Sequence, residues 1–163
     1  MKRAEMLKDA LKKATNPKEK AELQKQLEKS LRGRKSRAKG SSYESKIANI
    51  FNTGFEAFGL VLKRTPSSGG FAKAEKNEFV SGDLSCLSPD LYFKLHIECK
   101  SQKVIKMREW ISQSNSDCVE GKIPTIIFHV SKEMSKLDVG DYITLPLKDF
   151  LIIVDGESII EER

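Results

Sequence analysis

The sequence predicts an α/β protein in which helices flank a mixed β-sheet, preceded by a basic helical extension at the N-terminus. Apolar residues recur at helical spacing over 41–59, and a further helix is expected over about 106–120. Apolar and polar residues alternate over 92–101, and a mostly apolar run occupies 123–130, and both patterns are typical of β-strands. Helices and strands that alternate along one chain indicate the α/β class.

The N-terminal extension, residues 1–39, differs from the main domain, residues 40–163, in its charge. Residues 1–40 hold 14 Lys and Arg against 5 Asp and Glu, a net charge of +9, whereas residues 41–163 hold 15 against 18, a net charge of −3. A basic segment of this kind favours a polyanion, because each phosphate that it neutralises releases condensed counterions. The alternative is a helix surface that is only solvated. The candidates for nucleic-acid contact in this segment are Arg34, Lys35, Arg37 and Lys39.

Two helices are predicted in the extension. Asn16 suits an N-cap and Pro17 the first helical position, so a second helix begins there and is expected to end at Gly33. Its apolar residues form a narrow stripe, Leu23, Leu27 and Leu31. This stripe must pack against the first helix, the main domain or a second copy of the chain. The basic run over 32–40 lacks apolar periodicity and is predicted to be a linker or a DNA-contacting strip.

Composition argues against several other classes of protein. No stretch approaches 18 consecutive apolar residues, and the first residues are charged where a signal peptide needs an apolar run. We therefore expect a cytoplasmic protein without a membrane partner. The three cysteines are an odd set without C-x-x-C spacing, which predicts reduced thiols and neither a disulfide framework nor a zinc site.

Further strands are predicted around these elements. A strand is expected over 60–65, followed by a polar loop over 66–82 that is long for a passive connection. Residues 83–88 and 92–101 are predicted to form a hairpin around a turn that begins with Pro89. Two strand-like segments complete the chain, 142–146 and 150–154.

The segment 92–101 carries the residues with chemistry. Its alternation places Glu98 and Lys100 on one face, roughly 6.6 to 7 Å apart along the strand. A carboxylate there can hold Mg²⁺, with Mn²⁺ as a substitute, while the ammonium group orients or helps to deprotonate a water that attacks phosphorus. His96 shares this face, but a lone strand histidine is more often simply hydrogen-bonded, and we assign it no role. Because phosphodiester hydrolysis needs both functions, the pair indicates a candidate site for that reaction.

A metal that also binds phosphate and water usually needs a second carboxylate, for which Asp83 and Asp90 are candidates. In the predicted hairpin Asp83 lies opposite Glu98, whereas Asp90 sits at the tip, roughly 23 to 27 Å of strand away. Asp83 is therefore the predicted second ligand. Asp90 is interpreted as a turn residue that follows a proline.

These motifs resemble those of a known superfamily. SGDL followed by IECKS resembles the Asp and Glu-x-Lys elements of PD-(D/E)xK nucleases. KRTPSSGG is similar to the Arg and Ser-Gly-Gly segment of archaeal-type and phage-encoded Holliday junction resolvases, and KGSSYESKIANIF is similar to their first helix. EWISQSNSDCVEGKIPTIIF resembles their helix and following strand. The resemblance covers roughly residues 39–131.

The resemblance implies a restriction-endonuclease-like fold and a Mg²⁺-dependent endonuclease that resolves Holliday junctions or other branched DNA. It also implies a homodimer, in the host-cell cytoplasm if the chain is phage-encoded. Catalytic or metal-associated roles would fall to Glu44, Asp83, Glu98 and Lys100, with the metal on Asp83 and Glu98. The loop with Ser67 and Ser68 would approach the scissile strand, and Gln113 takes the place of a commonly seen helical glutamine.

Several alternatives stay open. Glu44 follows Ser41 by three positions, which is the capping-box arrangement, so its role can be structural. Arg64 can neutralise a phosphate or form a surface ion pair, and Gln113 can be an ordinary helix-surface residue. Other functions to weigh are a restriction- or repair-type nuclease with another DNA substrate and a DNA-binding protein that does not cut. The intact Asp, Glu and Lys set disfavours the last.

Overall fold

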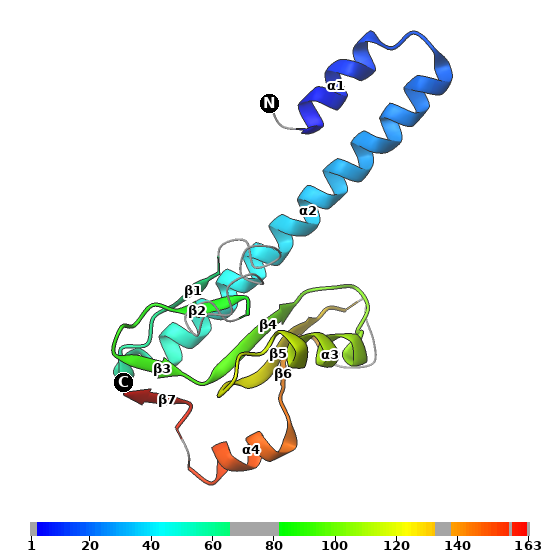
Figure 1. Ribbon diagram of the computed structural model, residues 1–163. Coiled ribbons are helices and arrows are strands. Elements are labelled where there is room, and N and C mark those ends of the chain that lie inside the picture. Colours follow the sequence, from blue (N-terminus) through cyan, green and yellow to red (C-terminus); the bar gives the residue numbers. More distant parts are fainter. Residues whose placement is uncertain (1–2, 66–81, 133–137, 157, 163) are drawn as a thin grey trace. The chain divides into compact units, whose positions relative to one another are not determined.

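The computed structural model describes four stretches of the chain, residues 3–65, 82–132, 138–156 and 158–162 (Figure 1). The chain divides into two compact units, Met1–Gly40 and Ser41–Arg163. Of the predicted loop over 66–82, all but the last residue lies outside the described stretches, and so do Ser67 and Ser68.

The N-terminal unit consists of helix α1 (Arg3–Lys13) and the first part of helix α2 (Pro17–Gly54). The side chain of Asn16 accepts a 2.9 Å hydrogen bond from the backbone N–H of Lys18, which confirms the predicted N-cap. α1 folds back alongside α2 (Figure 1). Leu27 of the predicted stripe is buried, and so are Ala4 of α1 and Ala14 just after it. We infer from this burial that α1 is the partner that covers the stripe.

The predicted end of the second helix at Gly33 is wrong, and so is the predicted linker over 32–40. α2 continues through both without a break, to Gly54. A helix that stops at a glycine normally places it at positive φ, and Gly33 is not among the glycines with positive φ. Arg, Lys and Ala, which make up most of this run, are good helix formers, and a helical glycine costs only about 1 kcal/mol. No helix in the described part of the chain combines the length and apolar character needed to cross a membrane.

The second unit contains short β-sheets of both orientations, which confirms the mixed α/β fold (Figure 1). Strand β4 (Leu95–Lys100) pairs in parallel with β5 (Ile123–Val130), and β5 pairs antiparallel with β6 (Gly140–Thr144). The other two sheets are antiparallel pairs: β1 (Leu62–Arg64) with β2 (Leu84–Cys86), and β3 (Leu91–Phe93) with β7 (Ile160–Glu162). The helices that follow β4 and β6 are α3 (Met107–Asp117) and α4 (Leu147–Val154), and a short 3₁₀ helix, η1 (Glu56–Phe58), precedes β1.

Two predicted strand features are wrong. The residues predicted as one hairpin do not pair with each other, because β2 pairs with β1 while the chain after the turn is divided at Lys94 into β3 and β4. Alternation of apolar and polar residues shows which side chains share a face of a strand, but it does not show which other strand pairs with it. The segment 150–154, predicted as a strand, belongs to helix α4, because a short apolar run does not distinguish the two structures.

Strands β4 and β5 separate two apolar clusters that fix the position of the site. One cluster lies on the α2 side and includes Ile47, Ile97 and Ile127, all buried. The other lies on the α3 side, where Trp110 packs with Phe128 and its neighbours. Alternate side chains of β4 therefore face different helices, and the polar residues of β4 emerge on the α3 side.

Candidate active site

Glu98 and Lys100 lie side by side near the end of β4, as predicted. The Lys100 ammonium donates a hydrogen bond of 2.7 Å to Glu98 Oε2, and the two side chains are only 11% and 8% exposed. The neighbouring β5 residues in register are Ile126 and Phe128, so the pair is set in apolar surroundings. Screening by water is weak there, and the ion pair is held in one geometry.

Asp83 is brought to the same point by a glycine. Gly82 has a φ of +75° and forms a parallel bridge with Ile97, and a Cβ on this glycine would stand 2.4 Å from the Ile97 carbonyl oxygen. Only glycine fits this approach. The Asp83 N–H then donates to the Ile97 carbonyl at 2.7 Å, and Asp83 Oδ2 accepts from the Cys99 N–H at 2.8 Å. Asp83 thus reaches the Glu98 side of the strand as predicted, but through a parallel bridge and not through a hairpin.

The two carboxylates influence each other's protonation. Burial, followed by repulsion from Glu98, raises the pKa of Asp83 to about 6, although the Cys99 N–H acts in the opposite direction. Burial would also raise the pKa of Glu98, but hydrogen bonds and charge from His96 and Lys100 outweigh it and lower that pKa overall. A negative charge on Asp83 is therefore unfavourable at this point unless a cation offsets it.

The donor chemistry of this pair fits a hard divalent metal. Both donors are carboxylate oxygens, and Mg²⁺ prefers oxygen ligands and is commonly held by one or two carboxylates, with waters or phosphate oxygens completing its shell. Among the described residues, no group of three or more His, Cys, Asp and Glu side chains is arranged to hold a metal. A metal at this site would accordingly be held by Asp83 and Glu98 together with solvent or substrate.

Glu44 and Arg64 join the site from α2 and β1. Arg64 Nε lies 2.7 Å from Glu44 Oε2, and the charge of Glu44 contributes to the raised pKa of Asp83. The capping-box interpretation of Glu44 is wrong, because Ser41 lies inside α2 and no helix begins there. Of the two alternatives for Arg64, the structure shows the ion pair.

Gln113 on α3 connects to both members of the β4 pair. Its Oε1 accepts a 3.1 Å hydrogen bond from the Lys100 ammonium, and its Nε2 donates to Glu98 Oε2 at 3.4 Å. His96, to which the sequence assigned no role, is 1% exposed, with Nε2 at 3.7 Å from Glu98 Oε1. The alternation of β4 had already placed His96 on the Glu98 face, and the structure confirms that placement.

The other predicted residues lie apart from this group or outside the described stretches. Asp90 is exposed in the turn before β3, as expected of a turn residue. The four basic candidates are exposed on α2 within the N-terminal unit: Arg34, Lys35, Arg37 and Lys39.

A second polar group, missed by sequence reasoning, links α2 to β5 and β6. Asp141 accepts hydrogen bonds from Lys46 at 2.5 Å and from Tyr43 at 3.2 Å, and it lies 2.9 Å from His129 Nδ1. These residues are up to 98 positions apart in the chain. No local pattern could have joined them, and their contacts fasten the helix beside the site.

Asp83, Glu98 and Lys100, in this order along the chain and together at the end of β4, have the arrangement of the PD-(D/E)xK motif. A family model described as phage putative PDDEXK endonuclease matches residues 35–159 of the 163. The chain therefore belongs to this family of phage endonucleases, which confirms the superfamily resemblance. Nucleases of this type are typically dependent on a divalent metal. Searches of curated proteins and of solved structures found no match.

Proposed function

We propose that this protein is a metal-dependent endodeoxyribonuclease that hydrolyses phosphodiester bonds in branched DNA, such as four-way junctions. The observation that carries the proposal is the convergence of Asp83, Glu98 and Lys100 in a chain of the phage endonuclease family. A binding protein has no need of two carboxylates that repel each other beside a lysine. Hydrolysis of a phosphodiester does need such a group.

Asp83 and Glu98 would hold the metal, for which we propose Mg²⁺, with Mn²⁺ as a substitute. A bound divalent metal polarises a phosphate oxygen and makes a bound water more acidic. Asp83 is ready for this role above about pH 6, where it is ionised. Below that pH it holds a proton and is a poor ligand.

Lys100 would orient the attacking water or stabilise the negative charge that develops on the phosphate. Two of its contacts are fixed, to Glu98 at 2.7 Å and to Gln113 at 3.1 Å. An ammonium group has three N–H donors, so one donor remains for a water or a phosphate oxygen. Gln113 keeps both partners in place. Arg64 is paired with Glu44 but is 38% exposed, and it would exchange this partner for a phosphate oxygen when DNA binds.

The branched substrate is supported by the resemblance of residues 39–131 to Holliday junction resolvases. A four-way junction has two-fold symmetry, and a homodimer with one site in each subunit matches it. We therefore propose that the protein cuts two symmetry-related strands as a homodimer.

The test is cleavage of a synthetic four-way junction beside a linear duplex of the same sequence, with Mg²⁺ or with EDTA. Wild type should place paired symmetric nicks in the junction alone, and both EDTA and Glu98→Ala should abolish them. Equal cutting of the duplex would keep a nuclease with another substrate, of the restriction or repair type, and would discard junction specificity. Tight binding without metal-dependent cutting would discard the enzyme in favour of a DNA-binding protein.

A further inference from the structure

The N-terminal unit contains a groove of about 670 Å³ between α1 and α2. The residues that line it are Arg3, Ala4, Gln26, Lys29, Ser30, Gly33, Arg34 and Arg37. We propose that this groove binds the phosphate backbone of DNA. The choice of DNA as the polyanion rests on the proposed function, whereas the anionic character of the ligand rests on the groove itself.

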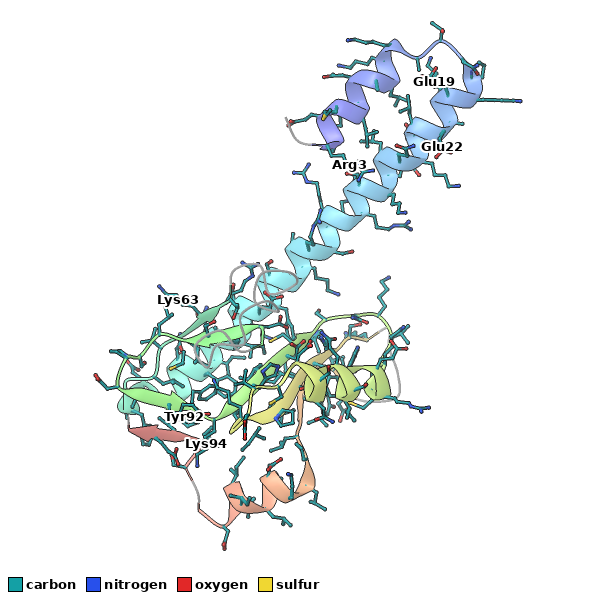
Figure 2. All side chains as sticks on the ribbon, in the orientation of Figure 1. Arg3, Glu19, Glu22, Lys63, Tyr92 and Lys94 are labelled. Atoms are coloured by element: carbon teal, nitrogen blue, oxygen red, sulfur yellow. The ribbon has the colours of Figure 1, made fainter. Side chains whose placement is uncertain are left out.

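The groove is rich in positive charge, and the ion pairs found among the described residues involve none of its cations. Arg3, Lys29, Arg34 and Arg37 are all exposed, and within the described stretches no ion pair joins any of them to a carboxylate. Residues 29–40 hold six Lys and Arg and no Asp or Glu. Figure 2 shows Arg3 beside α2, while Glu19 and Glu22 lie nearer to the turn between the helices. Like charges gathered without counterions favour an anionic ligand.

The α2 residues of the groove lie along one face of the helix. Gln26, Ser30, Gly33 and Arg37 follow each other at spacings of four, three and four, which places them in a row. Eleven residues of helix span about 16 Å, so the row suits an extended chain of phosphates better than one small anion. Arg3 comes from α1, so cations line the groove from both helices.

Gly33 keeps the floor of the groove open. Nothing lies within 4 Å of the position that a Cβ would take on this residue. A side chain can therefore be added there without a clash, and alanine is the better helix former. The glycine is thus not required for the helix, so substitutions at this position can test the groove without disturbing the helix.

Three of the four cations are arginines, whose planar guanidinium groups form paired hydrogen bonds with phosphate oxygens. Such contacts would hold the backbone and read no bases. The groove also divides the basic candidates of the sequence into two pairs. Arg34 and Arg37 line it, whereas Lys35 and Lys39 do not, although both pairs are exposed and carry the same charge.

This division supplies a matched test. Binding of a fluorescent linear duplex to the full chain would be measured in EDTA, which prevents cutting, between about 50 and 200 mM salt. Arg34→Ala/Arg37→Ala should weaken binding by about tenfold or more and reduce the salt slope by about 2. Lys35→Ala/Lys39→Ala removes equal charge and should change the affinity less than about threefold. Equal effects of the two double variants would overturn the proposal that the groove binds DNA, and would indicate general electrostatic attraction between the basic helix and DNA.

Gly33 provides a second test that removes no basic residue. Gly33→Glu places a carboxylate on the groove floor and should weaken duplex binding by about tenfold, whereas Gly33→Ala should bind as wild type does. Circular dichroism would show that both variants stay helical. Equal affinity of the two variants would overturn the proposal. If the groove variants lose DNA binding while the wild type cuts no DNA, the groove proposal is supported and the proposed nuclease function is wrong. If the groove variants bind normally while the wild type cuts junctions, only the groove proposal is wrong.

Discussion

The protein holds its charges in two different ways, in the candidate active site and in the N-terminal groove. Glu98 and Lys100 are 8% and 11% exposed and are joined to each other and to Gln113. The groove cations, such as Arg34 and Arg37, are exposed and have no ion pair within the described residues. Buried paired charges keep one geometry and are weakly screened, whereas exposed charges attract at a distance and respond to salt. The first arrangement suits chemistry on one phosphate, and the second suits attraction of many.

The two regions also differ in what the family match covers. The match begins at residue 35 and includes every residue of the candidate active site, whereas Arg3, Lys29 and Arg34 of the groove precede it. The site is therefore the part that the chain shares with its family. Variants in the two regions should therefore separate DNA cleavage from DNA binding.

The sharpest separation should come from Lys100→Met. Removal of the ammonium leaves Glu98 without its ion pair and the water without a donor, so cleavage should fall by about 100- to 10,000-fold. Duplex affinity in EDTA and its salt slope should stay within about twofold of wild type, because this lysine is not part of the exposed basic surface. Lys106→Met, at an exposed lysine paired with Glu109, is the control and should cut normally. A Lys100→Met protein that cuts at the wild-type rate would contradict the assignment of the site.

The next largest effect is expected from Gly82→Ala. An added Cβ meets the Ile97 carbonyl at 2.4 Å and is also unfavourable at a φ of +75°, so the bridge must open and Asp83 must shift. We expect cleavage to fall by about 10- to 100-fold, with a loss of about 2 kcal/mol in the free energy of unfolding. Rates at saturating substrate and urea titrations would measure the two effects.

Gly59→Ala is the matched control for the glycine prediction. Gly59 has a φ of +70° but nothing within 4 Å of an added Cβ, so this variant carries the backbone strain without the clash. It should lose about 1 kcal/mol of stability and keep its cleavage rate. If both variants keep full activity, the close approach of Gly82 to Ile97 does not position Asp83.

Protonation of Asp83 should give the active region a pH dependence that the groove lacks. Because burial and Glu98 raise its pKa to about 6, metal binding should require loss of a proton below that pH. Cleavage at limiting Mg²⁺ should therefore fall about tenfold for each pH unit below about 6. Duplex binding in EDTA should change little over the same range, because lysine and arginine stay charged.

The free energy of unfolding of the metal-free protein should change with pH in the opposite direction to the cleavage rate. Between about pH 4 and 6 the folded protein keeps a proton on Asp83 that the unfolded chain has lost, so this stabilising contribution disappears as the pH rises through about 6. Asp83→Asn removes the charge and should raise the stability of the metal-free protein by up to about 3 kcal/mol near pH 8. Thermal melts in EDTA would show this gain, and the gain should vanish near pH 4. A variant less stable than wild type at pH 8 would contradict the proposed repulsion.

The parts of the fold that the sequence could predict are those with a local signal. Strand β5 was predicted over the residues that it occupies, because a long apolar run between turns has few other structures. The side-by-side position of Glu98 and Lys100 follows from the period of two in a strand, and that geometry does not depend on which strand lies next to β4.

The parts that could not be predicted depend on distant partners. β2 pairs with β1 in a register that places Arg64 opposite Leu84, although these residues lie 20 positions apart in the sequence. No local pattern in either segment predicts this pairing. Helix α2 continues through Gly33 because the neighbouring residues favour a helix by more than the small free-energy cost of one helical glycine. The groove arises only when α1 returns along α2, so a linear view of the basic segment gave equal weight to Arg34 and Lys35.

The smallest effect is expected from Asp90→Ala, and it tests the motif most directly. The string Pro89-Asp90, followed by Glu98 and Lys100, imitates the written form of the PD-(D/E)xK motif. Asp90 is nevertheless exposed in a turn, whereas Asp83 accepts the Cys99 N–H beside Glu98. Asp90→Ala should cut junctions within about twofold of wild type and change stability by less than about 0.5 kcal/mol, while Asp83→Asn should abolish cutting. If the two variants lost cleavage equally, a position beside β4 would not determine which carboxylate takes part in cleavage. The proposed difference between buried and exposed charges would then also be wrong.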